Sequence, residues 1–464
     1  MHESTQDLQV IILAAGQGTR MKSALPKVLH TVGSKPMLAH VIDAAHGLNA
    51  KAIHVVYGHG GKAVMQRLNH QAVNWVLQEA QLGTGHAVAQ AMPSLADEQI
   101  ALVLYGDVPL IRRETLEKLV NIAGTRGLGL LTANLANPGG YGRIVRDEGG
   151  TVIRIVEEKD ATEAQRDIKE INTGMLAVNS SLLRHWLSRL DDNNAQGEYY
   201  LTDIIGMAAE DGVTIETCHP ASLHEIEGVN NKVQLAEIER VYQREQAGQL
   251  MLQGVTFMDP NRFDLRGELI VGQDVVIDVN VIIEGRVELG DNVHIGANSV
   301  LIDAIIGDDV SIKPNCIVES STVARGAEIG PFARVRPETL LGENVKVGNF
   351  VEIKKSTVAK GSKINHLSYI GDTVMGENVN IGAGTITCNY DGANKHNTVI
   401  GDNAFIGSDT QLVAPVEIGA GATIGAGSTI THDASPGKLT LSRSTQKTRD
   451  GWKRPVKNLV GKES

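Results

Sequence analysis

Hydrophobic and polar positions follow two different periods, one in each half of the chain. In the first half, apolar runs of strand length occupy residues 9–15, 52–57, 73–77 and 100–105, and amphipathic helical patterns occupy residues 36–48 and 114–123. Strands that alternate with helices predict a mostly parallel sheet covered by helices on both faces. We therefore expect a Rossmann-like α/β domain that binds ligands at the carboxyl ends of its strands.

In the second half, an aliphatic residue recurs at nearly every sixth position from Val271 onward, with occasional steps of five. The early members are Ile277, Ile283, Leu289, Ile295 and Leu301, and the late members are Ile406, Leu412, Ile418, Ile424 and Ile430. This period is the signature of a hexapeptide β-helix, in which each hexad forms one short strand and one corner. Gly follows many of the aliphatic positions, and we expect it at corners whose backbone conformation other residues resist.

Residues 233–253 connect the two halves. They carry apolar residues near helical spacing, many charges and no Pro, which predicts a long connecting helix. The sequence thus predicts an α/β domain at residues 1–232, a linker helix at residues 233–253, and a left-handed parallel β-helix with a C-terminal tail at residues 254–464.

The composition fits this division. Aromatic residues make up only 3% of the 464 residues and Gly occurs 50 times, as expected if bulky rings are excluded from a narrow β-helix interior. The 43 basic and 54 acidic residues give a net charge of −11, which argues against a general nucleic-acid binder. The cysteines are widely separated and the N-terminus has no signal-peptide pattern, so we expect a protein of the reducing cytosol. The longest apolar run is only Val10–Ala15, so we expect no membrane insertion.

The strongest short motif of the first half lies at the end of its first predicted strand. The segment Leu13–Arg20 reads LAAGQGTR and is followed by Pro26 and Lys27. Small residues let backbone N–H groups approach a nucleotide, and Arg20 and Lys27 can hold a triphosphate and stabilise charge that develops in phosphoryl transfer. The segment is neither a dinucleotide-binding GxGxxG motif nor a Walker A motif. A simple tight turn is the alternative for the glycines.

On these residues the first half resembles the sugar-phosphate nucleotidyltransferases. With the hexapeptide half added, the chain is similar, from about residue 8 to about residue 457, to the bifunctional bacterial family that joins N-acetylglucosamine-1-phosphate uridylyltransferase to glucosamine-1-phosphate acetyltransferase. The resemblance implies acetyl transfer from acetyl-CoA to glucosamine 1-phosphate, then uridylyl transfer from UTP with release of pyrophosphate. The product, UDP-N-acetylglucosamine, is a precursor for peptidoglycan and lipopolysaccharide. The resemblance also implies Mg²⁺, a cytoplasmic location and a homotrimer whose acetyltransferase sites lie between subunits.

The resemblance also implies roles for single residues of the first half. Binding of UTP and the sugar nucleotide is implied for Leu13, Ala14, Ala15, Gly16, Lys27, Gln78, Gly83, Thr84, Tyr105, Gly106, Asp107, Gly142, Glu157, Asn172 and Asn230. Asp107 and Asn230 would hold Mg²⁺, and Arg20 and Lys27 would be catalytic. Other interpretations stay open, with Asn230 as the N-cap of the connecting helix and Glu157 as a surface residue at a strand end.

The hexad series of the second half is interrupted once, between Thr387 and Ile400, where the step is 13 residues. An extruded loop has no core to bury, so function is a fair default for it. The resemblance identifies this insertion as an active-site loop and His366 as the general base, a task for which a neutral imidazole is suited near pH 7. It implies that glucosamine 1-phosphate is bound by Arg336, Lys354, Tyr369 and Asn380, and acetyl-CoA by Ala383, Asn389, Tyr390, Ser408, Ala426 and Arg443.

Taken singly, each of these residues has a plainer explanation. A lone His is usually structural, and isolated Arg or Lys residues are usually solvated. The basic tail at residues 447–457 is either a solvated tail or a cover over the CoA of an adjacent subunit, and Ser444 stands where the family pattern has Pro after the Arg. Individual cations beyond Arg443 are therefore not assigned to CoA.

Two other functions remain open at this stage. The β-helix could serve only for oligomerisation or effector sensing, as in relatives of ADP-glucose pyrophosphorylase, but such a scaffold would not require His366, the insertion or Arg443. The chain could instead be a non-catalytic assembly subunit, like subunits of the eukaryotic translation-initiation nucleotide-exchange factor. Intact Arg20 and Lys27, with Asp107 and Asn230 beside them, argue against that.

Overall fold

A computed structural model of the chain describes residues 7–58 and 60–457 and divides into two compact units, with the division after Gly248. The boundary falls within α8 (Lys232–Leu252), which confirms the predicted connecting helix. The expectation that no signal segment begins the chain concerns residues 1–6, which lie outside the described residues. In the described part of the chain, no helix combines the length and the apolar character that crossing a membrane requires.

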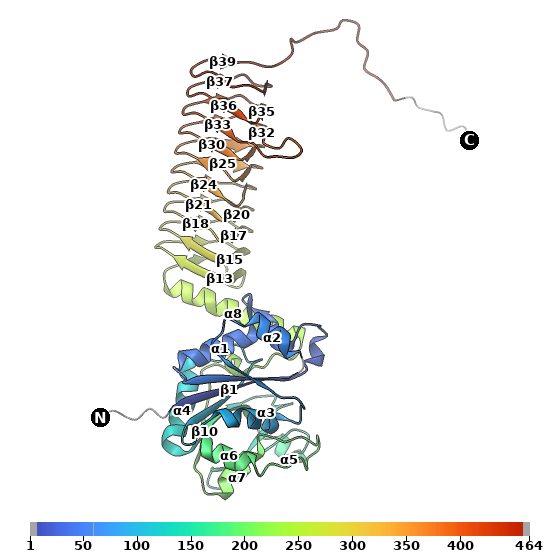
Figure 1. Ribbon diagram of the computed structural model, residues 1–464, viewed down its shortest axis with the longest axis vertical. Coiled ribbons are helices and arrows are strands. Elements are labelled where there is room, and N and C mark those ends of the chain that lie inside the picture. Colours follow the sequence, from blue (N-terminus) through green and yellow to red (C-terminus); the bar gives the residue numbers. More distant parts are fainter. Residues whose placement is uncertain (1–6, 59, 458–464) are drawn as a thin grey trace, which may run out of the picture. The chain divides into compact units, whose positions relative to one another are not determined.

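The first unit is built on a mixed sheet whose strands run in the order β11-β7-β10-β6-β1-β4-β5 (Figure 1). The strands of this sheet are β1 (Leu8–Ala14), β4 (Ala52–Tyr57), β5 (Asn74–Leu77), β6 (Ile100–Tyr105), β7 (Leu128–Asn134), β8 (Arg143–Arg146), β9 (Val152–Val156), β10 (Glu170–Asn179) and β11 (Ile215–Cys218). Two short strands, β2 (Thr31–Val32) and β3 (Lys35–Pro36), pair with each other in a separate sheet. Strand β1 is central and runs parallel to both β4 and β6, whereas β10 is antiparallel to β6 and β7. The parallel strands end together and leave their carboxyl ends at one edge.

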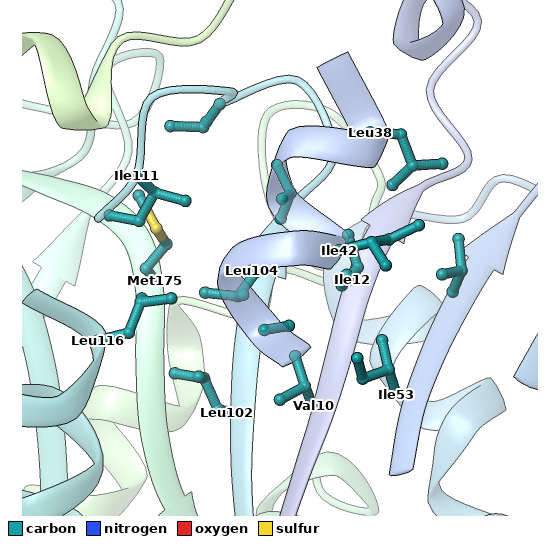
Figure 2. Close-up of a cluster of buried hydrophobic side chains, with 14 of the residues drawn as sticks. Val10, Ile12, Leu38, Ile42, Ile53, Leu102, Leu104, Ile111, Leu116 and Met175 are labelled. Carbon is teal, nitrogen blue, oxygen red and sulfur yellow. The ribbon is translucent and has the colours of Figure 1, made fainter. Parts of the chain in front are cut away.

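Helices cover both faces of this sheet, as the sequence predicts. They are α1 (Met37–Gly47), α2 (Gly61–Arg67), α3 (Thr84–Ala91), α4 (Arg113–Arg126), α5 (Glu163–Arg166), α6 (Ser180–Leu187) and α7 (Asp203–Glu210). The period of two in β1 divides the core, because Val10 and Ile12 pack against α1 and α4 on one face (Figure 2). Ile11 and Leu13 belong to the cluster that contains residues of α3, α6 and α7. Each such buried side chain contributes about 1.5–3 kcal/mol, so the sheet is anchored on both sides.

The second unit is a parallel β-helix whose coils are stacked in chain order (Figure 1). The long strands β13 (Phe263–Val271) and β15 (Val281–Leu289) open the stack. The first ladder contains β12 (Thr256–Phe257), β14 (Val276–Ile277), β16 (His294–Ile295), β19 (Ser311–Ile312), β22 (Glu328–Ile329), β25 (Lys346–Asn349), β28 (Lys363–His366), β31 (Asn380–Ile381), β34 (Phe405–Ile406), β37 (Thr423–Ile424) and β39 (Leu439–Thr440).

Two further ladders form the other faces of the triangular stack. The second ladder contains β17 (Val300–Ile302), β20 (Ile317–Glu319), β23 (Arg334–Val335), β26 (Glu352–Lys354), β29 (Tyr369–Gly371), β32 (Ile386–Cys388), β35 (Gln411–Val413) and β38 (Thr429–Ile430). The third ladder contains β18 (Ile305–Ile306), β21 (Ser321–Val323), β24 (Thr339–Leu341), β27 (Thr357–Val358), β30 (Thr373–Met375), β33 (Thr398–Ile400) and β36 (Val416–Ile418). The aliphatic series from Ile277 to Ile430 is buried throughout, which confirms the hexad prediction, whereas Val271 in the first coil is only half-buried.

We expected the glycines that follow the inward aliphatic residues to occupy corners with a backbone conformation that other residues resist. That expectation is wrong at most of these positions. Glycines that follow the inward aliphatic residues, such as Gly290 and Gly348, do not have left-handed backbones. They lie where the next coil approaches closely, because a methyl group at Gly348 would be 1.9 Å from the carbonyl oxygen of Asn365. Asn and Asp occupy many of the left-handed corners, as at Asn298 and Asn315, and other glycines, such as Gly326 and Gly361, occupy some of the rest. Coil contact, more than corner conformation, therefore excludes side chains there.

Candidate functional sites

A cavity of about 320 Å³ lies at the carboxyl ends of β1 and β6, where open α/β sheets bind ligands. Its lining includes the sequence-predicted residues Leu13, Ala14, Ala15, Gly16, Lys27, Gln78, Gly83, Thr84, Tyr105 and Asp107. Gly106 follows directly, and its N–H donates to the carbonyl oxygen of Leu13 at 2.9 Å. Gln81 and Glu198 also line the cavity, although the sequence analysis did not single them out.

The loop at Leu82 and Gly83, which borders this cavity, is held by hydrogen bonds to its backbone carbonyl oxygens. The carbonyl oxygen of Leu82 accepts the N–H of Tyr199 at 2.8 Å, and the Gln78 side-chain amide donates to the carbonyl oxygen of Gly83 at 3.2 Å. A methyl group at Gly83 would lie 2.6 Å from the carbonyl oxygen of Tyr199, and the φ of Gly83 is 109°. Only Gly fits this position, which places the loop backbone against the cavity.

The charged centre of the first site joins Lys27, Asp107, Asn230 and Arg20. The Lys27 ammonium donates to Oδ2 of Asp107 and, at 3.0 Å, to Oδ1 of Asn230. Nη2 of Arg20 donates to the same Asn230 oxygen at 2.9 Å. A carboxylate oxygen and an amide oxygen from distant parts of the sequence thus converge on one cation. Oxygen donors of this kind suit a hard divalent cation such as Mg²⁺.

The structure also rules out the alternative in which Asn230 is the N-cap of the connecting helix. The side chain that caps α8 is Asn231, whose Oδ1 accepts the N–H groups of Val233 at 2.9 Å and Gln234 at 3.0 Å. Asn230 is therefore not the N-cap, and its amide oxygen faces the two cations instead. The backbone supports this arrangement, because Val229 N–H donates to the carbonyl oxygen of Asp107 at 2.9 Å.

The remaining predicted residues of the first half form a group beside Tyr105. The N–H of Asn172 donates to the carbonyl oxygen of Gly142 at 2.9 Å, and a methyl group at Gly142 would lie 3.4 Å from both carboxylate oxygens of Glu157. Burial raises the pKa of the Glu157 carboxyl. Burial also raises the pKa of the Tyr105 phenol, with the nearby carboxylates of Glu157 and Asp107 as smaller causes. Polar groups there can bond the hydroxyls of a sugar.

A second cavity, of about 510 Å³, begins at Glu157 and was missed by the sequence analysis. Thr202 donates to Oε1 of Glu157 at 2.9 Å, and Asp203 follows at the start of α7. Burial, with Asp191 and other carboxylates nearby, raises the pKa of Asp203 from 3.8 to about 6. An acidic residue in the first turn of a helix normally indicates only a favourable helix start, so the sequence carried no sign of this burial.

In the second unit, four predicted residues occupy one corner position on successive coils. We name this set the corner column, and it consists of His366, Ala383, Ser408 and Ala426. The amide N–H that follows each later member donates to the carbonyl oxygen of the member one coil earlier, at 2.7–3.2 Å. Arg443 completes the column, because its Nη1 donates to the carbonyl oxygen of Ala426 at 2.9 Å. Small side chains therefore separate His366 from a terminal cation.

Predicted and unpredicted cations meet near this column. Arg336 pairs with Glu352 on the second ladder, with Nη1 to Oε1 at 2.7 Å. Lys354 is in contact with Lys395 of the inserted loop, and that contact lowers the pKa of the Lys354 ammonium. Two ammonium groups in contact repel, so a shared anion would stabilise both. Sequence reasoning missed Lys395, although a cation in an inserted loop was a usable signal.

The inserted loop projects from the stack between β32 and β33 (Figure 1). Asn389 is buried, and its Nδ2 donates to Oδ2 of Asp372 at 2.5 Å. Tyr390 is exposed, and its hydroxyl donates to the carbonyl oxygen of Gly392 at 2.6 Å. Asn389 therefore anchors the loop to the stack, whereas the ring of Tyr390 is exposed while its hydroxyl is held within the loop.

The other predicted residues of the second half are spread over two faces. Tyr369 lies on the second ladder, with its hydroxyl 3.5 Å from Nδ2 of Asn389. Asn380 lies on the first ladder, in register with Lys363. The structure thus brings Tyr369 to the loop but leaves Asn380 across the corner from it. Residues 447–457 of the basic tail are exposed and contain no strand or helix.

Comparisons with known proteins match both halves of the chain. The MobA-like NTP transferase domain model matches residues 10–142, the GMPPB C-terminal domain model matches residues 265–349 and 325–402, and the bacterial transferase hexapeptide model (six repeats) matches residues 397–432. The bifunctional protein GlmU of Aromatoleum aromaticum is 58% identical over 454 residues, which cover 98% of this chain and 100% of the relative.

Another relative and one solved structure complete the comparisons. The bifunctional protein GlmU of Marinobacter nauticus is 58% identical over 450 residues, covering 97% of this chain and 99% of the relative. A nucleotidyl transferase structure from Methanothermobacter thermautotroptrophicus has a TM-score of 0.39 and 18% identity, covering 52% of this chain and 99% of that chain.

The raised pKa of Asp203 makes a prediction about stability. Because the folded state binds this proton more tightly than the unfolded chain, stability should fall as pH rises from about 4 to about 6, and stay lowered above that range. Asp203→Asn should therefore raise the unfolding temperature at pH 7.5 and have little effect at pH 4. Thermal unfolding at several pH values checks this, with the exposed Asp192→Asn as control. Equal shifts for the two variants at pH 7.5 would contradict the prediction.

Proposed function

The chain belongs to the GlmU family of bifunctional proteins, and from that premise we propose how its residues carry out the two reactions. It is a nucleotidyltransferase and a hexapeptide acetyltransferase that make UDP-N-acetylglucosamine. UTP and acetyl-CoA are its co-substrates. We assign uridylyl transfer to residues 1–232, acetyl transfer to residues 254–464 and the connection to residues 233–253. The chain works in the cytoplasm and needs no nucleic acid or membrane.

Uridylyl transfer is assigned to the cavity at the ends of β1 and β6. Gln78 and the Gly83–Thr84 backbone recognise the uracil ring, and residues Leu13–Gly16 approach the phosphates. Gly142, Glu157 and Asn172 hold the sugar beside Tyr105. An oxygen of N-acetylglucosamine 1-phosphate attacks the α-phosphorus of UTP, and the bond to pyrophosphate breaks. Arg20 and Lys27 neutralise the charge that develops, so positioning and electrostatics supply the catalysis.

The contacts of Lys27 support a Mg²⁺ site on Asp107 and Asn230. The Lys27 ammonium already contacts both oxygen donors, so it is a stand-in cation at the point where they converge. No group of three or more His, Cys, Asp or Glu side chains in the described residues offers another metal site. Bound Mg²⁺ supplies further neutralisation of the phosphate charge. Lys27, once released from Asp107, is free to bind a phosphate oxygen.

Acetyl transfer is assigned to the corner column, and this arrangement is the single observation that carries the assignment. Small side chains at Ala383, Ser408 and Ala426 let acetyl-CoA lie along the coils toward Arg443, which meets a phosphate of the cofactor. His366 stands at the other end of the column. Its imidazole takes a proton from the glucosamine nitrogen as that nitrogen bonds to the thioester carbonyl carbon, and the CoA thiolate leaves.

The sugar phosphate is assigned to the cations beside the column. Arg336, Lys354 and Lys395 surround the anion, and Tyr369, Asn380, Asn389 and Tyr390 complete the pockets for sugar and cofactor. Contact between the Lys354 and Lys395 ammonium groups supports this assignment, because like charges in contact gain from a shared phosphate. A β-helix that served only as a scaffold would need neither these cations nor His366.

Each unit has its own core, so we predict that the two activities can be removed separately. Asp107→Ala should lower uridylyl transfer by about 100-fold or more and leave acetyl transfer intact, because it removes one of two oxygen donors and the partner of Lys27. His366→Ala should lower acetyl transfer by about 100-fold or more and leave uridylyl transfer intact. The two half-reactions are assayed by pyrophosphate release and by free thiol.

The assay also separates the order of reactions. With UTP omitted, the wild-type protein should convert glucosamine 1-phosphate and acetyl-CoA to N-acetylglucosamine 1-phosphate and free thiol. Wild-type protein without thiol release would refute the acetyltransferase assignment. Loss of both activities in either variant would point to misfolding and contradict two independent sites.

The Lys27 ammonium occupies the position between Asp107 and Asn230 that we propose for Mg²⁺, and this leads to a prediction about metal binding. Lys27→Met keeps a side chain of similar length but removes the competing charge, so it should raise the affinity for Mn²⁺ without UTP by about tenfold or more. The same variant should lose uridylyl transfer. Electron paramagnetic resonance of free Mn²⁺ measures the affinity directly. The control is Lys22→Met, which removes an exposed cation nearby and should leave Mn²⁺ binding unchanged. Equal or weaker Mn²⁺ binding by Lys27→Met would contradict the prediction.

We further propose a homotrimer, on the basis of two separate apolar surfaces of the β-helix. Phe332, Phe350 and Leu367 form an apolar corner between the first and second ladders, where Phe332 and Phe350 stack with ring centroids 5.3 Å apart. Outward positions of the third ladder form a mostly apolar row, which consists in order of Ile305, Thr322, Leu340, Thr357, Val374 and Val399. In a triangular coil this corner lies opposite this face. Two different apolar surfaces suit a head-to-tail contact, which closes a ring by rotation.

The apolar corner can be tested without loss of the fold. Asn occupies the same left-handed corner position at Asn298 and Asn315, so the double variant Phe332→Asn, Phe350→Asn suits the backbone while it removes apolar surface. It should shift the protein from trimer toward monomer in light scattering and lower acetyl transfer, with uridylyl transfer retained. Phe405→Asn is the control, because Phe405 is exposed on the charged first ladder. An unchanged trimer in the double variant would exclude this corner from the interface.

A further inference from the structure

The imidazole of His366 has a definite partner on the preceding coil. Its Nδ1 lies 3.0 Å from Oδ1 of Asn349, and Asn349 is directly in register with His366 where β25 pairs with β28. The coils are in tight contact at this point, because a methyl group at Gly348 would lie 1.9 Å from the carbonyl oxygen of Asn365. The backbone N–H of Leu367 also donates to the carbonyl oxygen of Asn349 at 3.1 Å. Both side chains are therefore held by well-fixed backbones.

The chemistry of this contact determines which ring nitrogen is basic. An amide oxygen only accepts hydrogen bonds, so it favours the tautomer whose proton is on Nδ1. Nε2 then carries the lone pair and is the atom that can take a proton from an amine. The charge of the partner matters as well. A carboxylate at this position would favour the imidazolium ion through its negative charge, whereas a neutral amide adds no such charge beside the ring.

We propose that Asn349 is a positioning residue for acetyl transfer, which orients His366 and sets its tautomer so that Nε2 is the proton acceptor. This inference rests on the proposed role of His366 as general base. Asn349 itself touches no reacting atom, so it acts only through the imidazole. Its replacement should change the rate and the pH dependence of acetyl transfer, and leave sugar-phosphate binding nearly unchanged.

Other groups around this corner could also influence the ring. The titratable and charged residues on the packed strands are Lys346 and Lys363 on the first ladder and Glu352, Lys354 and Tyr369 on the second ladder. Glu352 is engaged by Arg336, and Lys346 by Glu328. The imidazole itself is paired with the neutral Asn349, so a new carboxylate at that position would be its closest charge.

The experiment compares Asn349→Asp and Asn349→Ala in the full chain. In Asn349→Asp, the acid limb of the profile of kcat/KM against pH for acetyl transfer should move up by about one pH unit or more. In Asn349→Ala, kcat should fall by about tenfold to a hundredfold with KM for glucosamine 1-phosphate unchanged, because the ring loses its orientation. Nitrogen-15 NMR of the ring should show an unprotonated Nε2 in the wild type and a mixture of tautomers in Asn349→Ala.

The outcomes separate this inference from the proposed function. Uridylyl transfer serves as the internal control for folding and should be unchanged in both variants. If wild-type protein and His366→Ala had equal acetyl transfer, the assignment of the base itself would fail. A different pattern would overturn only the positioning role. In that pattern the wild-type protein is active and loses acetyl transfer when His366 is replaced. Asn349→Asp then keeps the acid limb of the wild-type pH profile, and Asn349→Ala keeps the wild-type kcat and ring tautomer.

Discussion

Close stacking of successive coils is the constraint on which the second unit depends. Parallel coils repeat at the strand spacing of about 4.8 Å, so residues one coil apart in the sequence become neighbours. This repeat brings Asn349 next to His366 and aligns the corner column. The same contact demands Gly where backbone meets backbone, as at Gly348. A single period therefore sets the buried series, the glycines and the order of the corner-column residues along one edge.

Charge is balanced differently in the two sites. In the first site, Lys27 is neutralised by Asp107 of the same chain, and Arg20 is held by the oxygen of Asn230. Lys27, Asp107, Asn230 and Arg20 thus form one connected network of side chains. In the second site, the ammonium groups of Lys354 and Lys395 are in contact, and the Asp372 carboxylate is a nearby countercharge to both. Two ammonium groups in contact still repel each other, and an added anion would reduce that repulsion. A chain with net negative charge can therefore bind anionic substrates through a handful of local cations.

The periodicity of the sequence predicted the fold well. It predicted the contacts and burial of individual side chains much less well. The inward series followed from the repeats, because it depends on short-range spacing, whereas most of the proposed site residues came from the family resemblance. Lys395 and Asp203 were missed because their environments come from folding, through a loop contact and a burial that spacing does not reveal. For Asn230 the capping alternative was wrong, since Asn231 caps α8 and Asn230 faces the cations. Scarcity of aromatic residues was explained by the narrow interior, yet Phe332 and Phe350 lie outside it.

The apolar corner places bulky residues in an unfavourable left-handed backbone conformation, which some other interaction must offset. Phe332, Phe350 and Leu367 have φ values of 55°, 56° and 51°, in the left-handed region where Asn is tolerated and larger side chains are strained by about 1–3 kcal/mol each. In a single chain they also expose apolar surface to water. Asn on the earlier coils avoids both costs. In the proposed trimer, burial of one such side chain between subunits would recover about 1.5–3 kcal/mol and so offset these costs. Because Leu367 directly follows His366, the proposed subunit interface and the proposed acetyltransferase site would share one corner.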